Sequence, residues 1–215
     1  MSANVTEPNQ PCIYVLAGTN GAGKSSIAGA AFRQHSSEYF NPDEAARRIL
    51  SNNPKLTQAQ ANSAAWQQGH RLLERAIQEQ LNFSFETTLG GKTITRLLEQ
   101  ALQQGIQVRI WYAGLENVEK HLARVRARVK RGGHDIPELD IRKRFDQSRL
   151  NLIHLLPQLT ELRVYDNSIE ADPATGKMPA PKLVLHTLQG KLVGPKRLAA
   201  TPDWAKPIVA AALPK

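Results

Sequence analysis

Short apolar runs alternate with amphipathic segments along most of the chain. Cys12–Ala17 is a continuous apolar run, typical of a buried parallel strand, and the phenylalanines of Phe83–Thr87 alternate as in a strand. A further strand is expected at 106–113. Between these runs, apolar residues recur at helical spacing, most clearly over 57–80 and 94–102. Strands that alternate with helices predict an α/β fold. Such a fold has a parallel sheet with helices on both faces, and its ligands bind at the carboxyl ends of the strands.

Shorter elements complete this pattern. We expect a helix at 24–34, a strand at 38–40, a helix at 43–50, two basic helices at 118–130 and 139–155, a strand at 162–165, a C-terminal hairpin of 183–185 and 191–193, and a helix from about 202. A length of 215 residues suits one domain. The chain should therefore consist of a disordered lead-in (1–11), one domain (12–200) and a C-terminal tail helix (201–215).

Composition narrows the class of protein. No run of 18 apolar residues exists and the N-terminus lacks an apolar signal core, so we expect a cytoplasmic protein with no membrane span. Cys12 is the single cysteine, which excludes an intramolecular disulfide and a zinc site built from cysteines. The net charge of +9 favours anionic partners such as nucleotides, sugar phosphates or nucleic acid. Residues 119–149 alone carry ten Lys and Arg against five Asp and Glu.

A phosphate-binding loop follows the first predicted strand. The pattern G-x-x-x-x-G-K-[ST] is matched in full by Gly18, Thr19, Asn20, Gly21, Ala22, Gly23, Lys24 and Ser25, with Ser26 next to it. Glycines let the backbone N–H groups point into a concavity that holds phosphates, where Lys24 reaches the β- and γ-phosphates and Ser25 ligates magnesium. We therefore expect ATP and Mg²⁺ as cofactors. The loop does not tell whether the acceptor is water or a substrate.

Carboxylates near the predicted loop are candidates for the acceptor side. Asp43 follows the strand at 38–40 and would serve as the general base that deprotonates an attacking hydroxyl, or it merely stabilises the first turn of a helix. Glu86, Thr87 and Thr88 end the strand at Phe83–Thr87. They suit hydrogen bonds to a polyhydroxylated substrate or to a water on magnesium, whereas the alternative is a helix cap.

The two basic helices supply candidate cations for a transferring phosphoryl group. Arg124, Arg128 and Arg131 step by four and three residues, so they share one helix face, and Arg142 and Arg144 lie on the next helix. Arginines on a mobile lid neutralise the charge that spreads over the phosphoryl oxygens during transfer. The pattern therefore predicts an arginine-rich helical lid.

A nucleic-acid interface is the competing interpretation of these helices, because paired basic helices also contact phosphate backbones. Aromatic residues are not interleaved in this stretch, which weakens the case for single-strand binding. Gly132 and Gly133 suit a hinge between the two helices. His134, which follows them, has no obvious metal-ligating partner, and we interpret it as a loop residue.

Taken together, the motifs resemble those of the zeta toxin family, the toxin half of bacterial toxin–antitoxin pairs. The resemblance covers roughly 13–168 and rests on five stretches in this order: AGTNGAGKSS, NPDEAA, FETTLGG, RVRARVKRGGHDIPELDIRKRF and VYDNS. It implies a nucleotide-kinase-like fold and transfer of the ATP γ-phosphoryl to the 3′-hydroxyl of UDP-N-acetylglucosamine. It also implies an antitoxin protein as partner, with nucleic acid as an unlikely one.

The resemblance also implies roles for individual residues. Lys24 matches the lysine of the phosphate loop, and Asp43 matches the aspartate that activates the sugar hydroxyl. Glu86 and Thr88 match a pair that contacts the substrate. The two arginines that stabilise the phosphoryl group would be Arg128 or Arg131, together with Arg142 or Arg144. Asn-Pro-Asp at 41–43 departs from the family's acidic cluster. This leaves open a small-molecule kinase, for example one acting on an antibiotic, a polynucleotide kinase, or a nucleotide-dependent nucleic-acid-binding protein.

Overall fold

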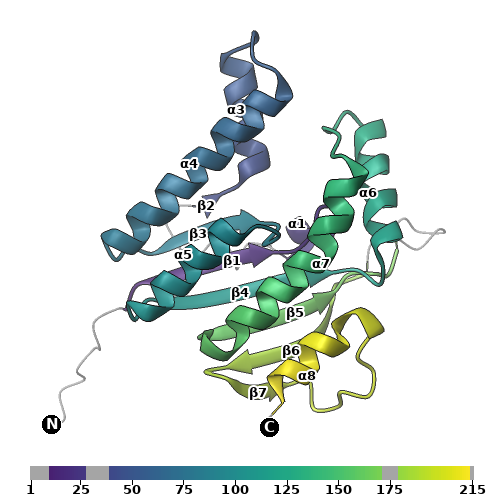
Figure 1. Cartoon of the computed structure of the whole chain (residues 1–215). Helices are drawn as coiled ribbons and strands as arrows, with labels where there is room; N and C mark the ends of the chain where they lie inside the picture. Colours follow the sequence, from purple (N-terminus) through teal and green to yellow (C-terminus); the bar gives the residue numbers. More distant parts are fainter. Residues whose placement is uncertain (1–9, 28–38, 171–178, 214–215) are drawn as a thin grey trace, which may run out of the picture.

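The structure, a computed structural model, describes residues 10–27, 39–170 and 179–213. It contains a mostly parallel sheet of seven strands in the order β2-β3-β1-β4-β5-β6-β7 (Figure 1). The strands are β1 (Cys12–Ala17), β2 (Tyr39–Phe40), β3 (Phe83–Thr87), β4 (Gln107–Gly114), β5 (Glu161–Asp166), β6 (Lys182–Leu188) and β7 (Lys191–Gly194). The strands from β2 to β5 are parallel, whereas β6 and β7 are antiparallel to their neighbours.

The helices agree closely with the sequence pattern. They are α1 (Lys24–Ile27), α3 (Pro42–Asn52), α4 (Gln58–Gln78), α5 (Lys92–Gln103), α6 (Val118–Lys130), α7 (Glu138–Leu155) and α8 (Lys206–Ala212), with two 3₁₀ turns, η1 (Leu156–Gln158) and η2 (Asp203–Ala205). Thr57 and Gln60 form a capping box at the start of α4, so this boundary has a local cause. The predicted helix at 24–34 is described only as far as Ile27, and most of the lead-in lies outside the described residues.

Helices α4, α5, α7 and α8 cover one face of the sheet (Figure 1). Their apolar side chains form one core with alternate residues of the strands, such as Val15, Ile110 and Leu162, which are fully buried. The intervening residues Leu16 and Trp111 point to the other face, where Ile27 of α1 packs against them. The fold therefore matches the predicted class of a P-loop, nucleotide-kinase-like sheet between helices. No helix in the described ranges is long and apolar enough to cross a membrane.

The C-terminal elements are more closely integrated than a separate hairpin and tail. Strand β6 pairs with β5 and so extends the sheet beyond the predicted hairpin. Trp204 and Ile208 of the last helical segment are 4% and 0% exposed and belong to the same core as the sheet. The tail expected at 201–215 thus packs on the domain as far as it is described.

Two helical pairs rise beyond the carboxyl ends of the parallel strands (Figure 1). The pair α3–α4 stands above β2 and β3 and is held together by a small cluster of alanines, Ala46, Ala61 and Ala65. The pair α6–α7 stands on the other side and forms its own apolar cluster around Leu122 and Ile141. The loops after β1, β2 and β3 end between these pairs.

Candidate functional site

The turn between β1 and α1 needs glycine for its shape. Gly18 has φ +140° and Gly23 has φ +77°, both in the region that side chains rarely adopt. A Cβ on Gly18 would lie 2.3 Å from the Ala113 carbonyl oxygen, and one on Gly23 would lie 2.2 Å from Asn167 Nδ2. The loop is therefore packed closely against the carboxyl ends of the neighbouring strands β4 and β5.

Two side chains far away in the sequence hold this loop from behind. Asn167, after β5, donates from Nδ2 to the Ala22 carbonyl oxygen at 2.9 Å. His121 of α6 lies 2.8 Å from the Asn20 carbonyl oxygen through Nδ1 and is 1% exposed. Burial lowers the pKa of His121 to about 4, so the ring is neutral near pH 7 and Nδ1–H is the donor to Asn20. Sequence reasoning missed both residues. Asn167 lies within the stretch VYDNS, which was its only signal, and His121 lies outside all five motif stretches.

Lys24 and Glu86 form the centre of the site. Lys24 donates from Nζ to the Gly18 carbonyl oxygen at 2.8 Å and lies 3.5 Å from Glu86 Oε1. The other oxygen of Glu86 accepts from Tyr39 OH at 3.0 Å and from Asn41 Nδ2 at 3.2 Å. The carboxylate at the end of β3 thus faces the lysine of the loop instead of capping a helix.

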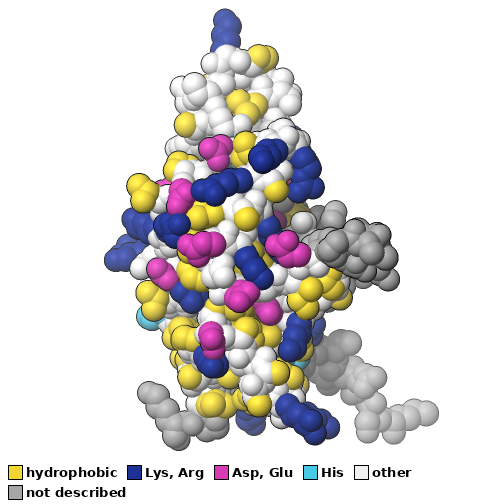
Figure 2. Space-filling model, turned by 90° about the vertical axis from the view of Figure 1, so that its right-hand side faces the viewer, with side chains coloured by type: hydrophobic (Ala, Val, Ile, Leu, Met, Phe, Trp, Pro, Cys, Tyr) yellow, Lys and Arg dark blue, Asp and Glu magenta, His cyan; other side chains and the backbone are white. Residues whose placement is uncertain are grey.

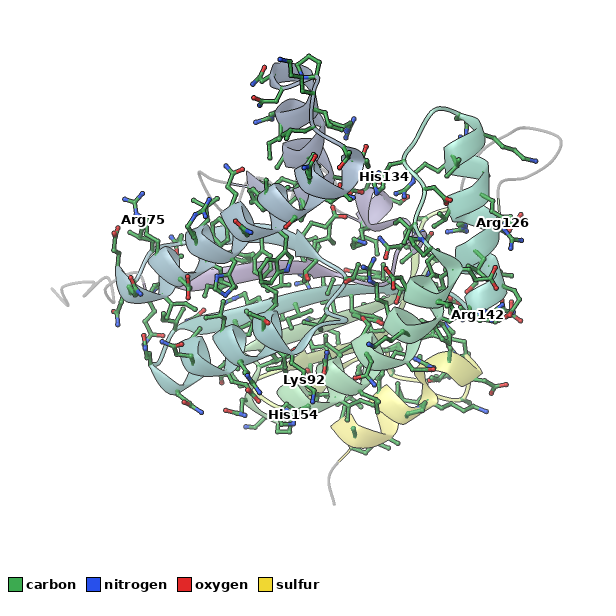
Figure 3. The ribbon with its side chains drawn as sticks, turned by 45° about the horizontal axis from the view of Figure 1, so that its top comes forward. Arg75, Lys92, Arg126, His134, Arg142 and His154 are labelled. Carbon is green, nitrogen blue, oxygen red and sulfur yellow. The ribbon has the colours of Figure 1, made fainter. Side chains whose placement is uncertain are left out.

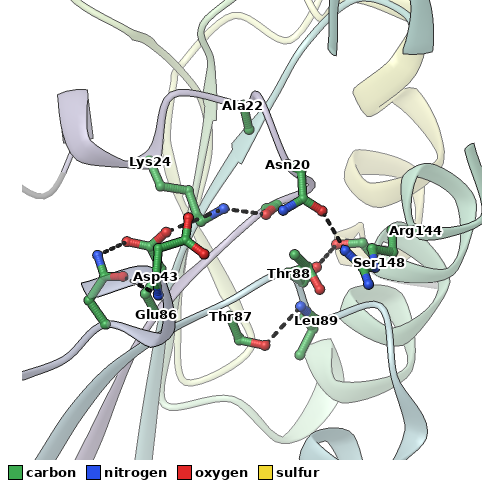
Figure 4. Close-up of polar contacts among 12 residues, drawn as sticks. Asn20, Ala22, Lys24, Asp43, Glu86, Thr87, Thr88, Leu89, Arg144 and Ser148 are labelled. Carbon is green, nitrogen blue, oxygen red and sulfur yellow. Dashed lines mark hydrogen bonds and ion pairs between the residues drawn. The ribbon is translucent and has the colours of Figure 1, made fainter. Parts of the chain in front are cut away.

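The threonines beside Glu86 also do not cap the next helix. Thr87 accepts the Leu89 N–H and Thr88 accepts the Gly90 N–H, so both shape the turn that leaves β3. The N-cap of α5 is Gly91, which has no side chain to offer. Figure 4 shows this turn next to Lys24, with the Thr88 carbonyl oxygen accepting a hydrogen bond from Ser148 of α7.

Asp43 lies in the first turn of α3, where Asn41 fixes it. Asn41 Oδ1 accepts the backbone N–H of Asp43 at 2.9 Å, while Asn41 Nδ2 binds Glu86. Asn41 therefore contacts both Asp43 and Glu86 and fixes the position of one relative to the other. Both carboxylates lie near Lys24 in Figure 4. The Asp43 side chain is 43% exposed, and its Oδ2 lies 3.6 Å from Arg128 Nη1. Asp43 is both a helix first-turn residue and a member of the site.

The lid arginines divide into two groups. Arg128 faces Asp43, and Arg144 donates from Nη1 to Asn20 Oδ1 of the phosphate loop at 2.9 Å. The exposed Arg131 instead donates to the Ala127 carbonyl oxygen of its own helix, and Arg142 binds Glu119 and Glu138. Figure 3 shows Arg142 on the outer side of the lid. The structure thus places Arg144 at the phosphate loop and Arg128 at Asp43, whereas the contacts of Arg131 and Arg142 lie within the lid.

Arg124 joins the loop from the same side as Arg128. Its Nη2 donates to the Asn167 carbonyl oxygen at 2.8 Å, and its Nη1 lies 3.5 Å from the position of a Cβ on Gly23. The spacing of four residues between Arg124 and Arg128 was the sequence signal for this placement.

Acidic partners balance the outer face of the lid. Arg126 pairs with Glu138, and Arg149 pairs with Asp146. Figure 2 shows the side of the molecule that carries this lid, where basic side chains are interspersed with acidic ones. Exposed pairs of this kind reduce the continuous positive potential that a nucleic-acid backbone requires.

Comparison with known proteins gives the same family that the motifs resemble. The family model described as zeta toxin matches residues 1–171. An uncharacterized protein of Haemophilus influenzae is 36% identical over 129 residues, which are 60% of this chain and 88% of that protein.

Two solved structures illustrate the similarity in fold. AvrRxo1-ORF1 with AvrRxo1-ORF2 and sulphate ions superposes with a TM-score of 0.65 at 16% identity over 94% of this chain. This chain spans 64% of the length of that protein, which has also been solved with ATP. The PezAT toxin–antitoxin system of Streptococcus pneumoniae superposes with a TM-score of 0.54 at 16% identity, over 74% of this chain and 70% of that one.

Proposed function

The chain belongs to the zeta toxin family, and we propose that it is a kinase that transfers the γ-phosphoryl group of ATP to a hydroxyl of a nucleotide sugar such as UDP-N-acetylglucosamine. The observation that carries the proposal is a site with two pairs of oppositely charged side chains. The phosphate-loop lysine Lys24 is paired with Glu86, and the carboxylate of Asp43 lies beside the lid arginine Arg128. Transfer to a hydroxyl needs a base next to the phosphates, and Asp43 is the carboxylate proposed for this role.

The loop residues suit ATP as the phosphoryl donor. Their glycine turn can wrap a phosphate chain. Among the described residues, the partners that the buried Lys24 ammonium would leave when phosphates arrive are the Gly18 carbonyl oxygen and Glu86. The exposed hydroxyl of Ser25, beside Lys24, is the group that would hold magnesium. Magnesium, when bound, would neutralise part of the phosphate charge. The ATP complex of AvrRxo1-ORF1, which has the same fold, supports this donor.

In the transfer step, Asp43 accepts the proton of the attacking hydroxyl. Lys24 exchanges the Gly18 carbonyl for the phosphates, and Arg128 and Arg144 turn from their resting partners, Asp43 and Asn20, to the phosphoryl oxygens. Arg144 already contacts the loop through Asn20, whereas Arg128 starts from Asp43. Glu86, with Thr87 and Thr88, lines the acceptor side.

The proposal is tested by measuring ATP consumption with a panel of nucleotide sugars and identifying the product by mass spectrometry. UDP-N-acetylglucosamine or a related sugar should accelerate ATP consumption and gain one phosphoryl group. Asp43→Asn should lower the transfer rate by about 100-fold or more while ATP still binds. Equal ATP consumption with and without every sugar would contradict the proposed acceptor class, and phosphorylation of an antibiotic or a polynucleotide end would replace it.

We also propose a protein partner that restrains the kinase in the cytoplasm. AvrRxo1-ORF1 and PezAT, which share the fold, were solved as a two-protein complex and described as a toxin–antitoxin system. A partner of this type should form a stable complex and prevent binding of a fluorescent ATP analogue. Undiminished analogue binding in the complex would contradict a partner that acts by covering the nucleotide site.

A further inference from the structure

His134 lies in the connection between α6 and α7, and this connection folds back onto Arg128. The Gly133 N–H donates to the Arg128 carbonyl oxygen at 3.0 Å, and Arg128 Nη2 donates to the His134 carbonyl oxygen at 3.3 Å. A Cβ on Gly133 would lie only 2.7 Å from Arg128 Cγ. The backbone around His134 is therefore positioned by the same arginine that faces Asp43.

The His134 side chain points toward the candidate base. Its Nε2 lies 3.9 Å from Asp43 Oδ1, while Arg128 Nη1 lies 3.6 Å from Oδ2. The imidazole is 19% exposed, and Figure 3 shows it between α3 and the lid. Within the described residues, these are the two basic side chains within 4 Å of the Asp43 carboxylate. Each carboxylate oxygen thus faces a different group of the lid.

The two carboxylate oxygens of Asp43 face different partners, and this difference matters during phosphoryl transfer. When Arg128 turns to the phosphoryl group, as the proposed function requires, Oδ2 loses its partner and becomes free to accept the hydroxyl proton. Without a second contact, the carboxylate would also lose its orientation, and misplacement by about 1 Å is costly in a reaction of this kind. A shift of about 1 Å would bring Nε2–H of His134 into hydrogen-bond distance of Oδ1.

We propose that His134 is a positioning residue for Asp43. It holds Oδ1 while Arg128 releases Oδ2, so that the base keeps its direction at the moment when it takes the proton. This inference rests on the proposed function. It differs from a purely structural role in one testable respect, because the brace between the lid connection and Arg128 uses the backbone carbonyl of His134. Any substitution at 134 keeps that carbonyl, so side-chain variants isolate the contact with Asp43.

The test compares His134→Ala, His134→Gln and the matched control His70→Ala in the full chain. His70 is another half-buried histidine that pairs with a carboxylate, Glu74, on its own helix α4. His134→Ala should lower kcat about 10-fold and leave the KM for ATP and the Tm unchanged. Gln carries an N–H donor near the position of Nε2, so His134→Gln should recover most of kcat. His70→Ala should behave as wild type.

A double variant separates positioning from other effects. In the Asp43→Asn background, His134→Ala should cause no further loss, because the residue acts through Asp43. An unchanged kcat for His134→Ala, an additive loss in the double variant, or an equal loss in His134→Gln accompanied by weaker ATP binding would each overturn the inference. If no nucleotide sugar accelerates the wild type, the proposed acceptor fails. The same comparison on ATP hydrolysis, with water as the acceptor, then decides the role of His134.

Discussion

A pair of charged residues, Lys24 and Glu86, determines how the centre of the candidate site is arranged. Lys24 and Glu86 are buried to similar degrees, with side chains 9% and 16% exposed. A buried ammonium group needs a counter-charge, and Glu86 provides it until phosphates do. The carboxylate therefore stabilises the loop, and under the proposed function it competes with ATP for the lysine.

Replacing Glu86 by Gln should lower the free energy of unfolding and raise the affinity for ATP. We expect the free energy of unfolding to fall by about 1–3 kcal/mol, because Lys24 loses its counter-charge. ATP should bind more tightly, because the lysine no longer leaves a carboxylate to reach the phosphates. Chemical denaturation and isothermal titration with ATP measure the two effects. Glu74→Gln, which removes an exposed carboxylate beside His70, is the control. Weaker ATP binding in Glu86→Gln would contradict this role.

His121 should make the stability of the fold sensitive to acid. Its pKa is about 4 in the folded chain, against about 6.5 when unfolded, because burial disfavours the charged ring. The unfolded chain therefore binds the extra proton as the pH falls below 6.5. Between pH 7.5 and pH 5 this costs the folded state about 2 kcal/mol.

Urea denaturation at the two pH values, on wild type and His121→Gln, measures this difference. Gln keeps a donor for the Asn20 carbonyl oxygen but does not titrate. Other ionisable groups are common to both proteins, so their contributions cancel. The variant should lose about 2 kcal/mol less than the wild type on acidification. Equal losses would show that His121 does not titrate on unfolding.

At the scale of elements, the lid has an inner and an outer side. Arg144 and Arg142 are two residues apart on α7, yet the first binds Asn20 of the phosphate loop and the second binds Glu119 of α6. Arg144→Ala should lower the transfer rate about 100-fold, since a cation at the loop is removed. Arg142→Ala should leave the rate within about 2-fold and change stability little, as exposed ion pairs do. Steady-state transfer rates of the two variants test this difference. Similar rate losses in Arg144→Ala and Arg142→Ala would contradict an inner and an outer side of the lid.

Local pattern was sufficient to predict most of the elements. The apolar run of β1, the alternation of β3 and the glycine turn at 18–23 are each determined by neighbouring residues, and the structure confirms the fold class. The pairing of β6 with β5 was not predictable, because an antiparallel neighbour leaves no signal in a seven-residue strand. The helix expected at 24–34 is described for its first turn alone.

The candidate site was predictable only in part. Lys24, Asp43 and Glu86 follow strands, so topology brings them to one edge. His121 and Asn167 brace the loop across 101 and 145 residues of sequence, and no local pattern encodes such contacts. His134 was interpreted as an ordinary loop residue because its partner, Asp43, is also remote in sequence.

At the scale of the whole molecule, Trp204 links the C-terminal segment to the site. Its ring packs against Gly114 and lies 6.3 Å from the ring of Tyr112 in the core. Its Nε1–H donates to Asp166 Oδ1 at 3.2 Å, one residue before Asn167, which holds the phosphate loop. Core packing and the nucleotide site therefore share one support.

Removing the Trp204 ring should lower both the stability of the fold and the affinity for ATP. Trp204→Ala should lower the free energy of unfolding by about 3–5 kcal/mol, as loss of a buried aromatic side chain does. It should also weaken ATP binding, because the turn that carries Asn167 loses a contact. Trp66→Ala is the matched control, since Trp66 is 49% exposed and its loss should cost less than about 1 kcal/mol. Denaturation curves and ATP titrations measure the two effects. Unaltered ATP affinity in Trp204→Ala would show that the C-terminal segment does not support the nucleotide site.

The bond between Trp204 and Asp166 has a consequence for the order in which the protein matures. A chain emerging from the ribosome presents the phosphate loop early, at residues 18–25, but the last support of that loop arrives some 180 residues later. During synthesis the growing chain carries a nucleotide loop without its final brace. If Trp204→Ala weakens ATP binding as predicted, the loop reaches its full affinity for ATP only late in synthesis, and a partner of the proposed kind has the time of translation to bind first.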